Sequence, residues 1–257
     1  METATYDLIV IGSGPGGEKG AAQAAYFGKK VALIEQASRL GGAVANTGVP
    51  GKGMRETALY LSGLRGRDLH GVQLNEQGQL EVNDRFQTSV PHIYAAGDVI
   101  GGLALSSTAM EEARMAVVNA FDLRYKAGMA RHLPIGVWTI PELSMVGETE
   151  ESLRAKGRAY VVGRCRYQHN PRGALIGERW GLLKLLFSVP EEQLLGVQMI
   201  GENACELIAS GFVGMTMGAT TATFIDTCFN YPSVPDIYKY TTYDAMGNLQ
   251  RGDCYRA

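Results

Sequence analysis

Short apolar runs alternate with glycine-rich and alanine-rich segments at the start of the chain. The apolar run 6–11 enters a glycine turn, 12–17, and the alanine-rich segment 17–27 follows it. A second apolar run, 30–34, ends at Glu35. This order predicts a strand, a tight turn, a helix that packs closely on a sheet, and a second strand.

Further elements are expected before residue 133. A helix is predicted over 54–64, and alternating apolar and polar residues predict a short strand over 79–82. Residues 93–96 are expected to form a buried strand that runs into Gly97 and Asp98. A helix is predicted over 106–121, because small and apolar residues recur along one helical face.

The pattern changes at residues 131–134, which we take as a domain boundary. Beyond them, apolar runs of strand length predict an antiparallel sheet with helices between its strands. The expected strands are 137–140, 159–163, 182–187 and 194–200, and the expected helices are 150–156, 202–217 and 235–246. We therefore predict an α/β domain over residues 1–133, followed by an α+β domain over 134–257.

The glycine turn has the spacing Gly-x-Gly-x-x-Gly, made by Gly12, Gly14 and Gly17. In a strand–turn–helix unit these glycines permit the tight turn, the close approach of a pyrophosphate, and close packing of the helix on the strand. Glu35 then stands where a carboxylate accepts hydrogen bonds from an adenosine ribose. The alternative is an ordinary turn, but the complete unit favours a dinucleotide site.

Composition narrows the function classes. The chain has 257 residues, 46% of them hydrophobic, and a net charge of −2, which gives no electrostatic reason to expect nucleic acid or an anionic membrane as a partner. The apolar runs are too short to cross a bilayer, and no signal pattern precedes the first strand, so we expect a cytoplasmic protein. Neither the four cysteines nor the four histidines have metal-site spacing, so we expect free thiols and no metal.

A second motif, Thr-x-x-x-x-Ile-Tyr-Ala-Ala-Gly-Asp, ends at Asp98. The two motifs together resemble the FAD fingerprints of the flavoprotein disulfide reductase superfamily, the class I pyridine nucleotide-disulfide oxidoreductases. Within it the chain resembles the soluble, Si-specific pyridine nucleotide transhydrogenases. The resemblance is carried by 12–18, 41–42, 50–52, 97–101 and 229–232, and by 139–147 and 195–201 of the dimerisation domain. It implies a truncated Rossmann-like FAD-binding domain, an α+β dimerisation domain and a homodimer.

The resemblance also implies which residues contact FAD. The pyrophosphate would be held by Gly12, Ser13, Gly14, Pro15 and Gly17, the adenosine ribose by Glu35, and the ribitol by Asp98. Gly42 and Gly97 complete the two glycine loops, and Leu105 and Ser106 begin a helix whose dipole would stabilise a reduced flavin. Lys52 matches a lysine near the reactive edge of the flavin, with a solvated loop lysine as the alternative.

Catalytic candidates are weaker. Tyr231 falls where disulfide reductases carry a catalytic histidine, and Asp236 falls where they carry the acid that orients it. A tyrosine with an ordinary pKa is not a base at neutral pH. We therefore interpret Tyr231 and Asp236 as structural or pocket-lining residues, with Lys52 as the remaining candidate.

The sequence departs from the family pattern in two places. The family carries a redox disulfide after the Gly41-Gly42 loop, but residues 43–50 contain no cysteine, as in the transhydrogenase branch. The NAD(P)-binding domain of the family is also missing, near 65–78, and no second nucleotide turn is found elsewhere.

These features predict an FAD-dependent oxidoreductase that passes electrons from NAD(P)H through flavin without a redox disulfide. NAD(P)H would be a transient substrate without a binding domain of its own. The alternative is a catalytically impaired FAD-binding or dimerisation remnant that exchanges no hydride. A third possibility is an interaction module with an empty nucleotide cleft.

Overall fold

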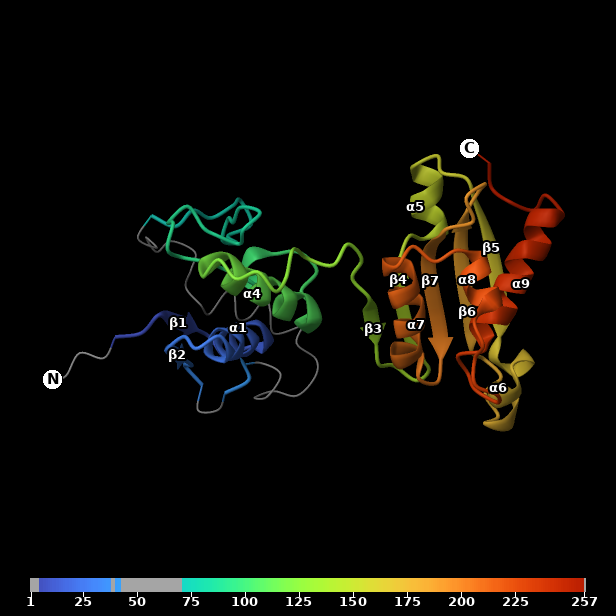
Figure 1. Ribbon diagram of the computed structural model, residues 1–257, viewed down its shortest axis with the longest axis horizontal. Helices are drawn as coiled ribbons and strands as arrows, with labels where there is room; N and C mark the ends of the chain where they lie inside the picture. Colours follow the sequence, from blue (N-terminus) through green and yellow to red (C-terminus); the bar gives the residue numbers. More distant parts are fainter. Residues whose placement is uncertain (1–4, 38–39, 43–70, 257) are drawn as a thin grey trace. The chain divides into compact units, whose positions relative to one another are not determined.

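The computed structural model describes residues 5–37, 40–42 and 71–256. It divides into two compact units, Met1–Met129 and Ala130–Ala257 (Figure 1). The helix predicted over 54–64 and the candidate Lys52 lie outside the described residues. Within the described ranges, no helix is both long enough and apolar enough to cross a membrane.

The first unit begins with the predicted strand–turn–helix–strand order. Strand β1 (Leu8–Ile11) is followed by helix α1 (Pro15–Tyr26) and strand β2 (Val31–Ile34). The two strands pair in parallel, with Leu8 opposite Val31 and Ile11 opposite Ile34. This is the first half of a Rossmann-like unit, and it confirms the α/β fold predicted for this part of the chain.

Helix α4 (Ser106–Ala120) confirms the helix predicted after Asp98 and packs against α1. The contact is close because both helices present small residues: a Cβ built on Gly16 would lie 3.1 Å from the Ala109 carbonyl oxygen, and one on Gly20 would lie 3.5 Å from the Ala113 Cβ. The numbers of the contacting residues increase in the same direction along both helices, so α1 and α4 run parallel. Their N-termini therefore lie at the same end.

The strands predicted over 93–96 and 79–82 are wrong. In the described part of this region only isolated bridges form, Leu74 with Leu80 and Gln87 with Tyr94. The backbone finds its partners locally instead: the Ile93 N–H donates to the Val90 carbonyl at 2.9 Å, and the Ala95 N–H donates to the Phe86 carbonyl at 3.0 Å. Asp98 consequently follows a series of turns and isolated bridges rather than the end of a buried strand.

The second unit is the predicted α+β domain, built on one antiparallel sheet in the order β3-β4-β7-β6-β5 (Figure 1). Its strands are β3 (Ile135–Val137), β4 (Glu142–Gly147), β5 (Tyr160–Arg166), β6 (Leu182–Ser188) and β7 (Leu194–Gly201). β4 was not predicted. The strand predicted over 137–140 is largely wrong, because Thr139 lies in the turn after β3, where its hydroxyl donates to the Pro141 carbonyl.

Helices cover both faces of this sheet. Buried residues of α7 (Ala204–Thr216) and α9 (Ile237–Gln250) share one core with β6 and β7, whereas α5 (Glu150–Ala155) packs with Leu186 and Leu195 on the other face. These three helices confirm the predicted ones. The short helices α6 (Pro171–Leu175) and α8 (Thr221–Asp226) were not predicted, since a helix of one or two turns leaves little periodicity to read.

Candidate functional site

The turn between β1 and α1 depends on three glycines for different reasons. Gly12 has a φ of +93°, which favours glycine, and its N–H donates to the Ile34 carbonyl of β2 at 2.8 Å. A Cβ on Gly17 would lie 1.9 Å from the Gly12 carbonyl oxygen, so only glycine permits this approach of α1 to the turn. A Cβ on Gly14 would meet nothing within 4 Å in the described part of the chain. Among the described residues, the turn is therefore crowded at Gly17 and open at Gly14.

Ser13 and Glu35 form a hydrogen-bonded pair behind this turn, which we call the Ser13–Glu35 lock. Ser13 is fully buried, and both its N–H and its hydroxyl donate to Glu35 Oε2, at 2.9 and 2.5 Å. The Gly41 N–H donates to the Ser13 hydroxyl in turn, at 2.9 Å. Ser13, expected to hold the pyrophosphate, thus has both of its donors directed at Glu35.

Glu35 is held in its ionised form. The Ala37 N–H, which donates to Oε1 at 2.9 Å, and the two Ser13 donors lower the pKa of Glu35 from 4.5 to about 2. Each carboxylate oxygen has two lone pairs. Among the described residues, Oε2 accepts two hydrogen bonds and Oε1 accepts that of Ala37, while the Gln36 backbone also lowers the pKa of this carboxyl.

A second glycine loop reaches the first. Gly42 has a φ of +58°, and a Cβ on it would lie 2.7 Å from the Gly14 Cα. This separation is too short for any side chain. The Gly41-Gly42 loop therefore forms one border of the open space beside Gly14.

The Gly97-Asp98 turn is held from two sides. Gly97 is buried, has a φ of +84°, and donates its N–H to Glu112 Oε2 of α4 at 2.7 Å. On the other side, the Leu80 N–H donates to the Val99 carbonyl at 2.8 Å. Asp98, the first residue of the 3₁₀ helix η1 (Asp98–Ile100), is exposed. The Gly97 backbone that supports the turn is thus buried, whereas the Asp98 carboxylate is exposed and accessible to a ligand.

Both turns contact the same residue of α4. A Cβ on Gly16 would lie 3.1 Å from the Ala109 carbonyl oxygen, and a Cβ on Gly97 would lie 3.3 Å from the Ala109 Cβ. The two motifs, separated by about eighty residues of sequence, therefore meet at the first turns of α1 and α4.

Neither of these helices has a side-chain cap among the described residues. Gly14 and Leu105 occupy the N-cap positions, and Ser106 is the first residue of α4. Uncapped first-turn N–H groups and the positive end of the helix dipole favour anions. Because the helices are parallel, two such ends lie together.

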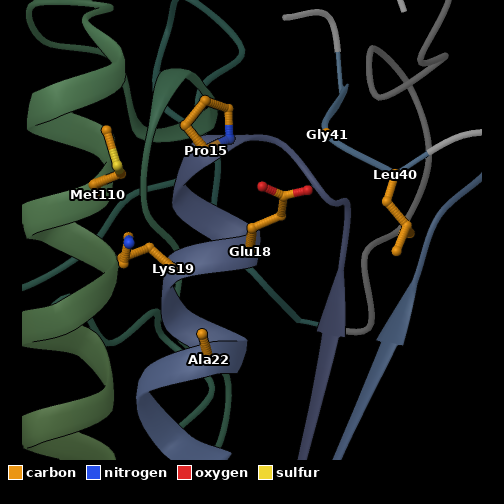
Figure 2. A pocket seen from close by; sticks show the side chains of 7 residues that line it. All are labelled: Pro15, Glu18, Lys19, Ala22, Leu40, Gly41 and Met110. Atoms are coloured by element: carbon orange, nitrogen blue, oxygen red, sulfur yellow. The ribbon is translucent and has the colours of Figure 1, made fainter. Parts of the chain in front are cut away.

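A cavity of about 440 Å³ adjoins this end of α1 (Figure 2). Its walls come from α1, from α4 and from the loop after β2, and the side chains of Glu18 and Lys19 give it charges of both signs. The lining residues are Pro15, Glu18, Lys19, Ala22, Leu40, Gly41 and Met110. The cavity thus offers space beside the glycine turn for part of a ligand.

Sequence reasoning missed Glu112. Burial raises the pKa of this carboxyl, and the charge of Asp98 raises it further, while the hydrogen bond from Gly97 opposes both. The available signal was an acid with alanines, Ala109 and Ala116, as its i−3 and i+4 neighbours on the helix.

The other candidates are not part of this cluster. Tyr231 and Asp236 belong to the second unit: Tyr231 is 74% exposed, and Asp236 is buried at the N-cap of α9, where its charge raises the pKa of Tyr240. All four cysteines are free thiols. No group of metal-binding side chains occurs in the described ranges.

The matches to family models fall in the same two parts of the chain as the two compact units. Residues 7–48 match an FAD binding domain, and residues 56–113 match the pyridine nucleotide-disulphide oxidoreductase model. Residues 133–241 match the pyridine nucleotide-disulphide oxidoreductase dimerisation domain. The first match covers the Gly12–Gly17 turn and supports FAD as the cofactor.

Curated relatives of the chain include soluble pyridine nucleotide transhydrogenases. The protein of Mycobacterium tuberculosis (strain ATCC 25177 / H37Ra) is 38% identical over 237 residues, which are 90% of this chain and 50% of the relative. That of Klebsiella pneumoniae is 38% identical over 70% of this chain and 39% of its own length. The chain thus spans half or less of the length of these relatives.

Solved structures share the fold. The HOCl-induced flavoprotein disulfide reductase RclA of Escherichia coli matches 93% of this chain and 65% of its own, with a TM-score of 0.63 and 21% identity. LpdA of Mycobacterium tuberculosis matches 93% and 62%, with a TM-score of 0.64 and 21% identity.

The two glycines of the first turn are expected to differ when replaced. G17A forces a Cβ onto the Gly12 carbonyl and should destabilise the first unit by about 1–3 kcal/mol. G14A should leave stability nearly unchanged but weaken binding of ADP roughly tenfold, the equivalent of a clash of about 1–2 kcal/mol. Thermal unfolding and calorimetric ADP titration of the full chain measure both effects. Unaltered ADP affinity in G14A would contradict an open phosphate site there.

Glu35 is expected to titrate at about pH 2 rather than near 4.5. Because its pKa is lowered in the folded state, the stabilisation from the Ser13 and Ala37 hydrogen bonds is complete above pH 4.5 and is lost as the pH falls toward 2. The carbon-13 shift of the Glu35 carboxyl, assigned with E35Q, follows this titration. S13A should move the pKa back toward 4.5, and an ordinary pKa in the unmodified chain would refute the lock.

Proposed function

Because the chain belongs to the pyridine nucleotide-disulphide oxidoreductase family, we propose that it is an FAD-dependent oxidoreductase that accepts electrons from NAD(P)H without a redox disulfide. One observation carries this proposal: the two glycine turns meet at Ala109, beside the uncapped N-termini of α1 and α4. That arrangement gives one ligand an anion site and a second, acidic site on the same unit.

The residues fit FAD in shape and in charge. The open side of Gly14 and the first-turn N–H groups of α1 suit a pyrophosphate, which needs close backbone approach and positive potential. The ionised Glu35 carboxylate, which Ser13 and Ala37 hold in place, suits an adenosine hydroxyl as a hydrogen-bond donor. The exposed carboxylate of Asp98 suits hydroxyls of the ribitol chain. Gly42 keeps a side chain out of the space between them.

Each residue would bind or orient rather than react. Gly12 and Gly17 set the path of the turn, Ser13 orients Glu35, and Gly97 places Asp98. Leu105 and Ser106 would direct the α4 dipole at the anionic side of the ligand. When bound, FAD supplies reversible two-electron chemistry. Lys52 stays a proposed contact at the flavin edge on sequence grounds alone.

A second candidate function is an FAD-binding remnant without hydride exchange. It is favoured by the span of the chain, about half of the curated relatives, and by a bare apolar face on the two-stranded sheet. Ile9, Ile11 and Ile34 are 57, 84 and 52% exposed on that face. In a complete parallel sheet, helices ordinarily cover both faces of the strands. NAD(P)H would then find no productive position.

Flavin binding and NADPH titration separate these functions. The full chain, incubated with FAD and freed of excess, should show the visible absorption of bound flavin, and anaerobic NADPH should bleach it. D98N should bind FAD at least about threefold more weakly, as expected for losing a charge-assisted hydrogen bond, whereas D84N, an exposed acid of the same unit, should not. A coloured protein that NADPH fails to bleach would favour the remnant. A colourless one would reject both.

We further propose that the second unit forms a homodimer. The match to the dimerisation domain covers 133–241, and α9 exposes the aromatic residues Tyr240 and Tyr243. Aromatic side chains are enriched in protein interfaces. Sedimentation equilibrium should give a dimer, and Y243R should shift it toward monomer at low micromolar concentration. Y26R, an equally disruptive change at an exposed tyrosine of the first unit, should leave the dimer intact; a monomeric unmodified chain would overturn the proposal.

A further inference from the structure

Glu112 is a buried acid to which the proposed function assigns no role. It lies in the middle of α4, is only 9% exposed, and accepts the Gly97 N–H on Oε2 at 2.7 Å. An acid is seldom buried to this extent unless it is paired or bound by donors. The hydrogen bond crosses from α4 to the turn that carries Asp98, so it adds a directional link to the packing of Gly97 on Ala109.

Gly97 has little freedom beside α4. Its φ of +84° and the 3.3 Å between a built Cβ and Ala109 Cβ place its backbone directly on the helix surface. Ala109 and Glu112 are three residues apart and so lie on one face of α4. Ala109 thus limits how closely Gly97 approaches, and Glu112 fixes the direction of its N–H.

The contact between Gly97 and Glu112 fixes the backbone position from which the Asp98 side chain projects. Gly97 and Asp98 share a planar peptide, and the Ile100 N–H donates to the Gly97 carbonyl at 3.0 Å. Glu112 therefore holds the N–H side of Gly97 while η1 holds its carbonyl side. Rotation at Gly97, which a glycine otherwise allows, would swing the Asp98 carboxylate away from its exposed position.

The chemistry of Glu112 also argues against a packing role alone. Burial disfavours the ionised form of Glu112, and the charge of Asp98 adds to that cost. Methionine would fill this volume without either penalty. A carboxylate does one thing that methionine does not: it accepts a strong, directional hydrogen bond from a backbone N–H.

We propose that Glu112 is a positioning residue of the flavin site, which fixes the Gly97-Asp98 turn so that Asp98 meets the ribitol hydroxyls. The inference rests on the proposed FAD binding and extends it to a residue that need not touch the ligand. The acceptor oxygen, rather than the negative charge, is the essential feature.

Three variants of the full chain test this. E112A removes the acceptor and should weaken FAD binding about tenfold or more, as for leaving a buried N–H without its partner. E112Q keeps an acceptor oxygen and should restore affinity to within about threefold of the unmodified chain. E111A is the matched control on the same helix: Glu111 binds Arg114 and Lys126, away from the Gly97 turn, and its loss should leave FAD affinity unchanged.

A double-mutant cycle separates positioning from general destabilisation. If Glu112 acts through Asp98, E112A should weaken FAD binding much less in a D98N background than alone. Amide hydrogen exchange at Gly97 should rise in E112A and stay protected in E112Q and E111A.

The outcomes are distinct. Equal affinity of E112A and the unmodified chain, failure of E112Q to restore binding, or additive effects with D98N would each overturn the positioning role while leaving FAD binding in place. If the unmodified chain binds no FAD, the proposed function fails and the positioning role fails with it. Tenfold loss in E112A, recovery in E112Q and coupling to D98N together would establish it.

Discussion

The absence of side chains between α1, α4 and the two turns is the constraint on which the candidate site depends. Gly17 lets α1 rest on the Gly12 carbonyl, and Gly16 and Gly20 let α4 rest on α1. Gly97 then reaches the same face of α4 at Ala109. A larger residue at Gly17 would push α1 off the turn, and one at Gly16 or Gly97 would move its neighbour by a few tenths of an ångström, whereas Gly20 has room for ordinary contact with Ala113.

The sequence predicts those parts of the molecule that repeat over short distances. The Gly12–Gly17 turn, the helix over 106–120 and the long apolar strands β6 and β7 are local patterns with strong periodicity or a specific glycine requirement. The strand predicted over 93–96 is wrong, because an apolar run forms a buried strand only when a neighbouring strand offers hydrogen bonds. Here Phe86 and Val90 supply the partners instead.

The candidate site shows the same division. Glycine spacing predicted the first turn, the family motif predicted the Gly97-Asp98 turn, and the order of strand, helix and acid made Glu35 a candidate. Glu112 could not be assigned in this way, because its role depends on a contact between residues fifteen apart whose relative placement only the fold determines. The engagement of Ser13 by Glu35 is equally non-local, since it needs the register that pairs Ile11 with Ile34 and brings the ends of β1 and β2 together.

The Ser13–Glu35 lock has a consequence for the choice among nucleotides. Its carboxylate is ionised at every physiological pH and is fixed before any ligand arrives, so the chain loses no side-chain freedom there on binding. In the proposed FAD-binding role, a ribose with free hydroxyls would donate to this carboxylate. A ribose that carries a 2′-phosphate would bring a second negative group against a carboxylate that neither moves away nor takes up a proton. In the proposed FAD-binding role, this carboxylate would favour adenosine with an unmodified ribose, by repulsion of a 2′-phosphate as much as by attraction of hydroxyls.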